Sequence, residues 1–134
     1  MSSCMDIGSM FVVIDKDLAA TTVPVTDTLW AELDAQFGDF AGASLISSFL
    51  FNEDWPTWEN HPHGDEFVCL LSGDAEMILA TADGETRIHL TDPGSFVIVP
   101  KGTWHTARVN APTRMLFVTP GQDTENREQP LLGA

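Results

Sequence analysis

Short apolar runs separated by turn-forming residues fill the sequence from about residue 43, and this pattern restricts the fold more than any other feature. The runs lie within residues 43–51, 66–73, 74–90, 92–102 and 103–121. Each is long enough for one strand or a hairpin, and turn residues recur every 8 to 12 positions. Six or seven short strands with this spacing predict an all-β sandwich or small barrel. In residues 74–90, Asp83-Gly84 is expected to form a two-residue type I′ hairpin loop.

The first 42 residues have a different pattern, with one short strand and one helix. Residues 10–14 (MFVVI) predict an edge strand or a strand exchanged with a second copy. The helix is expected to have a capping residue, an apolar face and a terminating glycine, namely Asp27, then Leu29, Leu33 and Phe37, then Gly38. Trp30 is expected to pack this helix onto the barrel.

Length and charge narrow the class of protein. The 134 residues suit a single domain, 1–134, with a barrel core at 43–119, an N-terminal strand and helix at 1–42 and a polar, loosely held tail at 120–134. The net charge is −14 and the six Lys and Arg residues are scattered, so neither nucleic acid nor an anionic membrane is an expected partner. No apolar run approaches the length of a membrane span. Two cysteines, Cys4 and a buried Cys69, form no disulfide framework and indicate the cytoplasm.

Histidines provide the candidate site. The chain has four, and His89 is assigned to the surface because it alternates with Ile88 and Leu90. His61 and His63 have the same parity in a segment expected to be extended, and His105 starts another strand just after a turn. Imidazoles with one carboxylate form a natural set of ligands for a divalent transition metal.

Two segments resemble the conserved motifs of the cupin superfamily, specifically a small single-domain cupin. Residues 94–105 (GSFVIVPKGTWH) fit the second motif, a glycine, five residues, Pro-x-Gly, two residues and a histidine. The first motif is His-x-His, three or four residues, Glu, six residues and Gly; the chain has His61-Pro62-His63, Glu66 and Gly73. The resemblance implies a double-stranded β-helix (jelly-roll) barrel and a metal site at His61, His63, Glu66 and His105.

The chain departs from the first motif at one point, because only Gly64 and Asp65 separate His63 from Glu66. In a regular strand Glu66 would then point away from both histidines. Three arrangements are open. A bulge at Gly64-Asp65 could restore the register, Asp65 could replace Glu66, or the site could have fewer than four protein ligands with His63 turned outward.

Four aromatic residues and one methionine near these motifs are candidates for the lining of a pocket: Phe49, Phe51, Trp58, Trp104 and Met115. Residues 51–59 (FNEDWPTWE) suit either a lid or mouth loop or a solvated connection held by its tryptophans.

The resemblance implies a small metal-binding protein that binds, or acts on, a small organic molecule at Fe, Mn, Ni or Zn inside the barrel. A dioxygenase, isomerase, lyase or similar enzyme is compatible with it, and no catalytic residue is assigned. The alternative is a non-catalytic small-ligand-binding or sensory cupin without metal. A metal-free epimerase using a tyrosine acid is disfavoured because the chain has no tyrosine. Single-barrel cupins also imply a homodimer.

Overall fold

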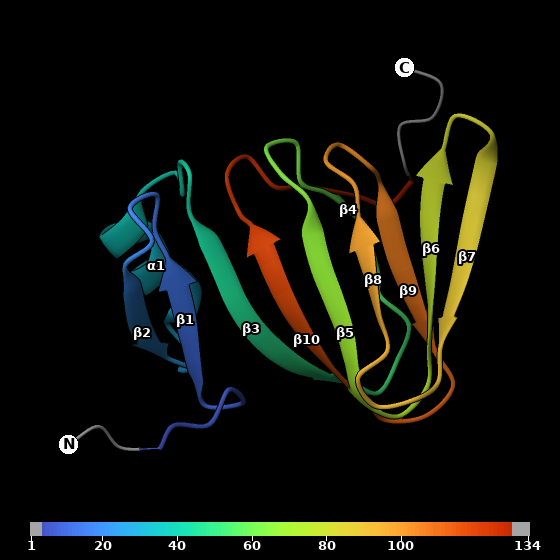
Figure 1. The fold of residues 1–134 in the computed structure, drawn as a ribbon, viewed down its shortest axis with the longest axis horizontal. Coiled ribbons are helices and arrows are strands. Elements are labelled where there is room, and N and C mark those ends of the chain that lie inside the picture. The colour runs from blue at the N-terminus through green and yellow to red at the C-terminus, as the bar shows by residue number, and fades with distance from the viewer. Residues whose placement is uncertain (1–3, 130–134) are drawn as a thin grey trace.

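A computed structural model describes residues 4–129 and shows two antiparallel β-sheets (Figure 1). The six-stranded sheet has the order β2 (Ala20–Pro24), β1 (Met10–Ile14), β3 (Ser44–Phe51), β10 (Thr113–Pro120), β5 (Glu66–Ser72) and β8 (Phe96–Val99). The five-stranded sheet has the order β11 (Glu125–Arg127), β4 (Trp58–Asn60), β9 (His105–Val109), β6 (Ala75–Thr81) and β7 (Gly84–Leu90). This is the jelly-roll barrel that the strand pattern and the motifs predicted.

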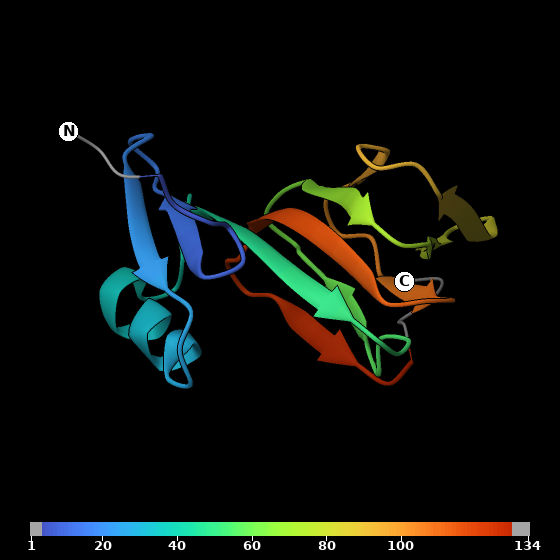
Figure 2. The ribbon, with the colours of Figure 1, turned by 90° about the horizontal axis from the view of Figure 1, so that it is seen from below.

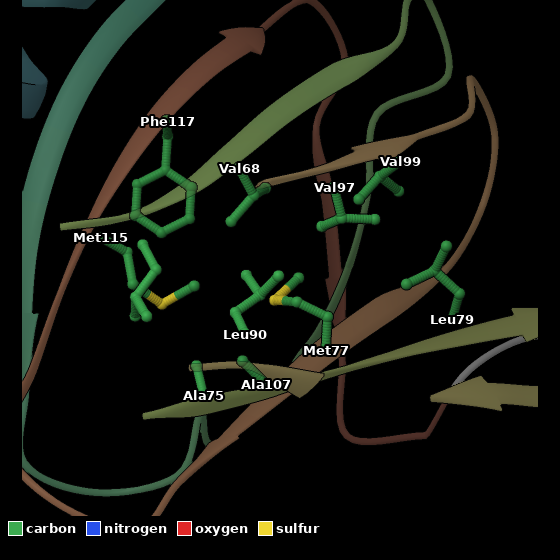
Figure 3. Close-up of a cluster of buried hydrophobic side chains, with 11 residues drawn as sticks. Val68, Ala75, Met77, Leu79, Leu90, Val97, Val99, Ala107, Met115 and Phe117 are labelled. Carbon is green, nitrogen blue, oxygen red and sulfur yellow. The ribbon is translucent and has the colours of Figure 1, made fainter. Parts of the chain in front are cut away.

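Alternation along the strands provides the barrel core. In β5, Val68 and Leu70 are fully buried, and in β10 Met115 is fully buried beside Phe117. These side chains meet those of the opposite sheet, including Met77 of β6, in one cluster (Figure 3). Residues of one parity therefore fill the space between the sheets, as period-two patterning requires.

The single helix of the described residues, α1 (Leu29–Phe37), lies with β1 and β2 at one end of the molecule (Figures 1 and 2). Leu29 and Leu33 are buried in a second apolar cluster with residues of β1 and β2. Thr28, rather than the expected Asp27, occupies the N-cap position and makes no side-chain capping bond. Trp30 stacks on Phe49 of β3, so it contacts the barrel as expected, but it remains 61% exposed and the two leucines are the buried attachment of the helix.

Strand β1 is not an edge strand, because β2 and β3 pair with it on both sides within the same chain. The edge position belongs to β2, a strand that the sequence pattern did not predict separately. Pairing with β2 covers all five residues of β1, and pairing with β3 covers Val12, Val13 and Ile14.

The hairpin between β6 and β7 also differs from expectation. Thr81 pairs with Gly84, so the two-residue loop is Ala82-Asp83. Neither loop residue has a positive φ, whereas Gly84 has φ of 116°. A type I′ turn needs positive φ at both loop positions, so that turn type is wrong here; the glycine takes the first paired position instead.

Part of the C-terminal segment is held against the barrel. β11 pairs with β4, and Asn60 of β4 donates a hydrogen bond to Glu125 at 2.9 Å. The expectation of a loosely held tail therefore does not apply to residues 125–127, and residues 130–134 of that segment lie outside the described chain. Within the described residues, no helix is long and apolar enough to cross a membrane.

Gly73, the last residue of the first motif, is required by close packing as well as by its backbone angle. Its φ is +94°, and an added Cβ would lie 2.5 Å from Thr113 Oγ1 and 2.6 Å from the Pro112 carbonyl oxygen. Gly94 has nearly the same φ, +93°, yet an added Cβ there would meet nothing within 4 Å. A substitution at Gly94 would therefore cause backbone strain alone, whereas a substitution at Gly73 would cause both backbone strain and steric overlap.

We expect Gly73→Ala to lower the free energy of unfolding by about 1–3 kcal/mol more than Gly94→Ala, because only the first adds overpacking to the strain of a positive φ. Urea denaturation followed by circular dichroism measures both. Equal losses in the two variants would contradict the role assigned to the contact with Thr113.

Candidate metal centre and cavity

Four side chains converge inside the barrel from three strands and one strand end. Glu59 of β4 pairs directly with His105 of β9 across the five-stranded sheet. His61 follows β4 at the next position of the same parity, and Glu66 begins β5 in the opposite sheet. His61, Glu66 and His105 side chains are 4%, 3% and 0% exposed, while that of Glu59 is 33% exposed. Three side chains of the group are therefore buried, and the carboxylate of Glu59 is more accessible than they are.

The polar atoms of the group lie within contact distance of one another. His105 Nε2 is 3.0 Å from Glu66 Oε1, and His61 Nε2 is 3.4 Å from Glu66 Oε2. His61 Nε2 is also 3.7 Å from Glu59 Oε2. One ligand atom each from Glu59, His61 and His105 can be chosen so that all lie within 4.8 Å of one another. This spacing suits a single ion shared by several donors.

Outer hydrogen bonds orient both imidazoles. His105 Nδ1 lies 2.9 Å from the Thr103 carbonyl oxygen, which can only accept, so Nδ1 carries a hydrogen. His61 Nδ1 lies 3.0 Å from Thr124 Oγ1, whose own hydrogen is donated to the Gly121 carbonyl oxygen. His61 Nδ1 therefore donates as well. Both histidines direct Nε2 to the centre of the group, as metal-binding histidines with outer partners do.

Three buried atoms at this centre have no hydrogen-bond partner: His61 Nε2, His105 Nε2 and Glu66 Oε1. His105 Nε2 and Glu66 Oε1 are close, but their geometry is not that of a hydrogen bond. Glu66 Oε2, by contrast, accepts a 2.6 Å bond from Thr119. Buried polar atoms are rarely left unpaired, and nitrogen and carboxylate donors together fit a divalent transition metal ion.

The protonation of the group reflects burial and mutual charge. Burial lowers the pKa of His61, but the carboxylates of Glu59 and Glu66 outweigh it and raise that pKa to about 9. Burial raises the pKa of Glu66, but the neighbouring His105 and His61 imidazoles outweigh it and lower that pKa to about 2. Without a metal ion, His61 therefore holds a proton where an ion would otherwise balance Glu66.

His63 lies outside the group. Its Nε2 is 2.8 Å from Asp123 Oδ2, and the two side chains are 46% and 66% exposed. Asp65 also faces away, since its carboxylate accepts a 2.8 Å bond from the backbone of Lys101. Of the three arrangements open from the sequence, the geometry matches the third in turning His63 outward, with Glu66 inside.

His63 does not share the inward direction of His61, because residues 61–65 are not one strand. β4 ends at Asn60 in the five-stranded sheet, Pro62 and His63 form a turn, and β5 starts at Glu66 in the six-stranded sheet. Alternation of side chains does not extend across such a crossover. Gly64 allows the turn to approach Pro120, where an added Cβ would come within 2.9 Å of two ring carbons.

Glu59 is the residue that the sequence reasoning missed. A signal was present, because Glu59-Asn60-His61 is followed by four residues and Glu66, and then by six residues and Gly73. This is the spacing of the first motif with glutamate in place of its first histidine. The match to His61-Pro62-His63 concealed it.

The group opens into a cavity of about 620 Å³. Phe49 and Phe51 line it, as expected, but Trp58, Trp104 and Met115 do not. Met115 is fully buried in the core, and Trp104 packs under the guanidinium of Arg127, 5.8 Å from the ring centre. Trp55, from the loop between β3 and β4, and Phe117 of β10 occupy the lining instead.

His89 is a surface residue, as expected. It pairs with Asp74 at 2.7 Å, and its side chain is 52% exposed. Hydrogen bonding to Asp74 raises the pKa of His89. It serves as an internal control for the buried histidines.

Comparison with known proteins gives one family match and several similar structures. Residues 51–119 match the family model of the cupin domain. Among solved structures, a cupin superfamily protein from Desulfitobacterium hafniense is 28% identical, with 57% of this chain and 65% of that chain covered and a TM-score of 0.47. Hydroquinone 1,2-dioxygenase from Sphingomonas sp. TTNP3, solved with 4-hydroxybenzoate bound, is 23% identical over 57% of this chain and 58% of its own, with a TM-score of 0.49.

Oxalate decarboxylase from Bacillus subtilis is 18% identical, with 63% of this chain and 23% of that chain covered and a TM-score of 0.50. The chain thus spans little more than half of the dioxygenase and about a quarter of the decarboxylase. Among curated proteins, none matches the sequence.

We expect Glu59→Gln to lower the pKa of His61 by roughly one unit or more from about 9, because it removes one of the two carboxylates that raise it. The measurement is an NMR titration of the histidine ring protons in chelator-treated protein. Glu53→Gln, at an exposed acid outside the cavity lining, should leave His61 unchanged, and His89 should titrate alike in all three proteins. An unchanged His61 in Glu59→Gln would contradict the electrostatics described.

Proposed function

The chain belongs to the cupin domain family, and we propose that it binds a divalent transition metal ion through Glu59, His61, Glu66 and His105 and holds a small organic molecule beside it. The observation that carries the proposal is the set of buried atoms without hydrogen-bond partners, two imidazole nitrogens and one carboxylate oxygen, which point at one place. The grouping of Glu59, His61 and His105 supports it.

The proposed ligand set replaces the one inferred from the motif alone. Glu59 takes the position given there to a third histidine, and His63 is left out because its ring is paired with Asp123. Fe, Mn, Ni and Zn all accept imidazole and carboxylate donors. A bound ion would supply Lewis-acid polarisation of an oxygen atom on the small molecule.

The protein's own residues define what surrounds that chemistry. Thr103 and Thr124 fix the two imidazole rings, and Thr119 fixes the carboxylate of Glu66. The aromatic lining above them surrounds the buried donors with apolar surface. A mostly apolar site with a few fixed polar groups suits binding of one small molecule in one orientation.

The metal proposal predicts a defined response to substitution. Since loss of an outer hydrogen-bond partner alone commonly weakens metal binding by about 10–100-fold, loss of a ligand should cost more. His105→Ala should therefore remove the metal that copurifies with the protein, whereas His63→Ala and His89→Ala should retain it. Mass spectrometry of metal content on the purified variants decides this.

Two results would contradict the proposal. Less than about a tenth of an equivalent of any transition metal in the native protein would exclude the metal site, because a site with three or four ligands normally retains its ion. Equal loss from His63→Ala and His105→Ala would exclude the ligand assignment.

We also propose a homodimer, formed through the outer face of the six-stranded sheet. On this face Leu50 of β3 and Phe96 and Ile98 of β8 are 50%, 56% and 47% exposed. Phe96 contacts Phe67 of β5, with ring centres 5.0 Å apart. The outward positions of β1, β3, β5, β8 and β10 carry no acidic residue, although the chain has 20.

A second copy of the chain is the occupant that this face fits. An exposed apolar surface of several strands commonly marks an interface. Two faces without acids can meet without the repulsion that a net charge of −14 would impose elsewhere on the surface.

The free thiols Cys4 and Cys69 support a reducing compartment, and we place the protein in the cytoplasm.

We expect light scattering to give the mass of a dimer for the native protein and of a monomer for the double variant Phe96→Asp/Ile98→Asp, because two charges would be buried without partners. Leu18→Asp provides the control, since Leu18 is 82% exposed and lies in the turn between β1 and β2. A monomeric native protein, or a dimer in the double variant, would refute this interface.

A further inference from the structure

The cavity beside the proposed ion is aromatic to an unusual degree for this chain. The sequence has eight Phe and four Trp and no Tyr. Half of these twelve line the cavity, and they are Trp30, Phe40, Phe49, Phe51, Trp55 and Phe117. Trp30 of α1 stacks on Phe49 with ring centres 6.5 Å apart and planes at 16°. The N-terminal helix thereby extends the aromatic wall of the barrel.

No Lys or Arg side chain lines this cavity. Its charged lining residues besides His61 are the acids Asp34, Glu59 and Glu66, and none of the six Lys and Arg residues belongs to it. Two of the cations are engaged elsewhere, Arg87 with Glu76 and Glu85, and Arg127 over Trp104. With His61 neutral as a ligand of the proposed ion, an anionic molecule that entered the cavity would find no side-chain counter-ion and would lose its hydration.

The proposed ligands also cancel the charge of the ion. Three neutral histidines and one carboxylate, as the motif alone implied, would leave a divalent ion with a net charge of +1. With Glu59 in place of the first histidine of the motif, the ligand set has two carboxylates and two neutral imidazoles. Their two negative charges balance the charge of the divalent ion. Such a centre gives a carboxylate or phosphate little electrostatic attraction.

We propose that the cavity selects an uncharged, largely apolar ring compound that carries a hydroxyl or carbonyl oxygen, and that it rejects carboxylates and phosphates. The aromatic lining supplies ring contacts for such a molecule, and 620 Å³ is within the range of sites for small organic ligands. This inference rests on the proposed function for the ion and names the substrate class of the same site.

An organic cation is the competing ligand class, because aromatic rings and acids can also surround an ammonium group. The metal centre does not favour an organic cation. The carboxylates of Glu59 and Glu66 could attract an ammonium group, but the charge of the divalent ion cancels that attraction. The carboxylate of Asp34 is the sole acid of the lining outside the proposed ligand set. We therefore assign the cavity to a neutral molecule and let the test include the cation.

Three phenols of nearly equal size test the inference on the protein as purified. They are 4-hydroxybenzyl alcohol, which is neutral, 4-hydroxybenzoate, which is anionic, and 4-hydroxybenzylamine, which is cationic at pH 7. Binding is measured by calorimetry and by quenching of tryptophan fluorescence, since Trp30 and Trp55 line the cavity. We expect the alcohol to bind at least about tenfold more tightly than the benzoate, because the unpaired charge opposes entry of the anion.

A charge variant tests the cause without replacing a proposed ligand of the ion. Asn126 of β11 lines the cavity beside Glu59, its cross-strand partner. Asn126→Lys should narrow or reverse the preference for the alcohol over the benzoate. Asn52→Lys, at an exposed residue outside the lining, adds the same charge and should leave the preference unchanged.

The outcomes are distinct. Equal or tighter binding of the benzoate to the native protein, tightest binding of the amine, or no binding of any of the three at millimolar concentration would each overturn the inference. Metal content is measured on the same samples. A protein that lacks metal but prefers the alcohol would refute the proposed metal site while supporting the ligand class, and a metal-loaded protein that prefers the benzoate would do the reverse.

Discussion

A carboxylate buried between two imidazoles is the constraint on which the site and its surroundings depend. Taking Glu66 out of water costs several kcal/mol unless its charge is compensated, and His61, His105 and the Thr119 hydroxyl supply that compensation. Each partner comes from a different segment. The pairing of β5 with β10, the position of β9 in the other sheet and the exit of the chain from β4 therefore have to be in place before Glu66 can be buried.

The crossover between the two sheets determines which histidine takes part. Because residues 61–65 lead from β4 to β5, His61 retains the inward parity of Glu59, whereas His63 sits on a turn beside Asp123. The segment after Pro120 is then positioned by both histidines, through Thr124 and Asp123. The short pairing of β11 with β4 holds the same segment against the five-stranded sheet. Residues 121–127, which the sequence pattern predicted as part of a polar tail, therefore support the site.

Glu59, which stands where the first motif has a histidine, links the proposed metal centre to the cavity above it. Glu59 balances the charge of the proposed ion, and the cavity adds aromatic rings but no Lys or Arg. The N-terminal helix contributes Trp30, which is exposed on one side and stacked on Phe49 on the other. Charge and shape therefore favour the same class of molecule, an uncharged ring compound, for independent reasons.

The sequence by itself determined the β architecture, the boundaries of most strands and three members of the inward group, because period-two alternation, turn residues and motif spacing are local properties. Spacing also contained Glu59, but a second histidine pair at 61 and 63 fitted the same pattern. Only the tertiary structure decided between them, since the direction of His63 depends on the change of sheet between β4 and β5. The same holds for Trp55, Phe117 and the β11 segment. Their positions follow from contacts between residues far apart in the chain, which no local pattern encodes.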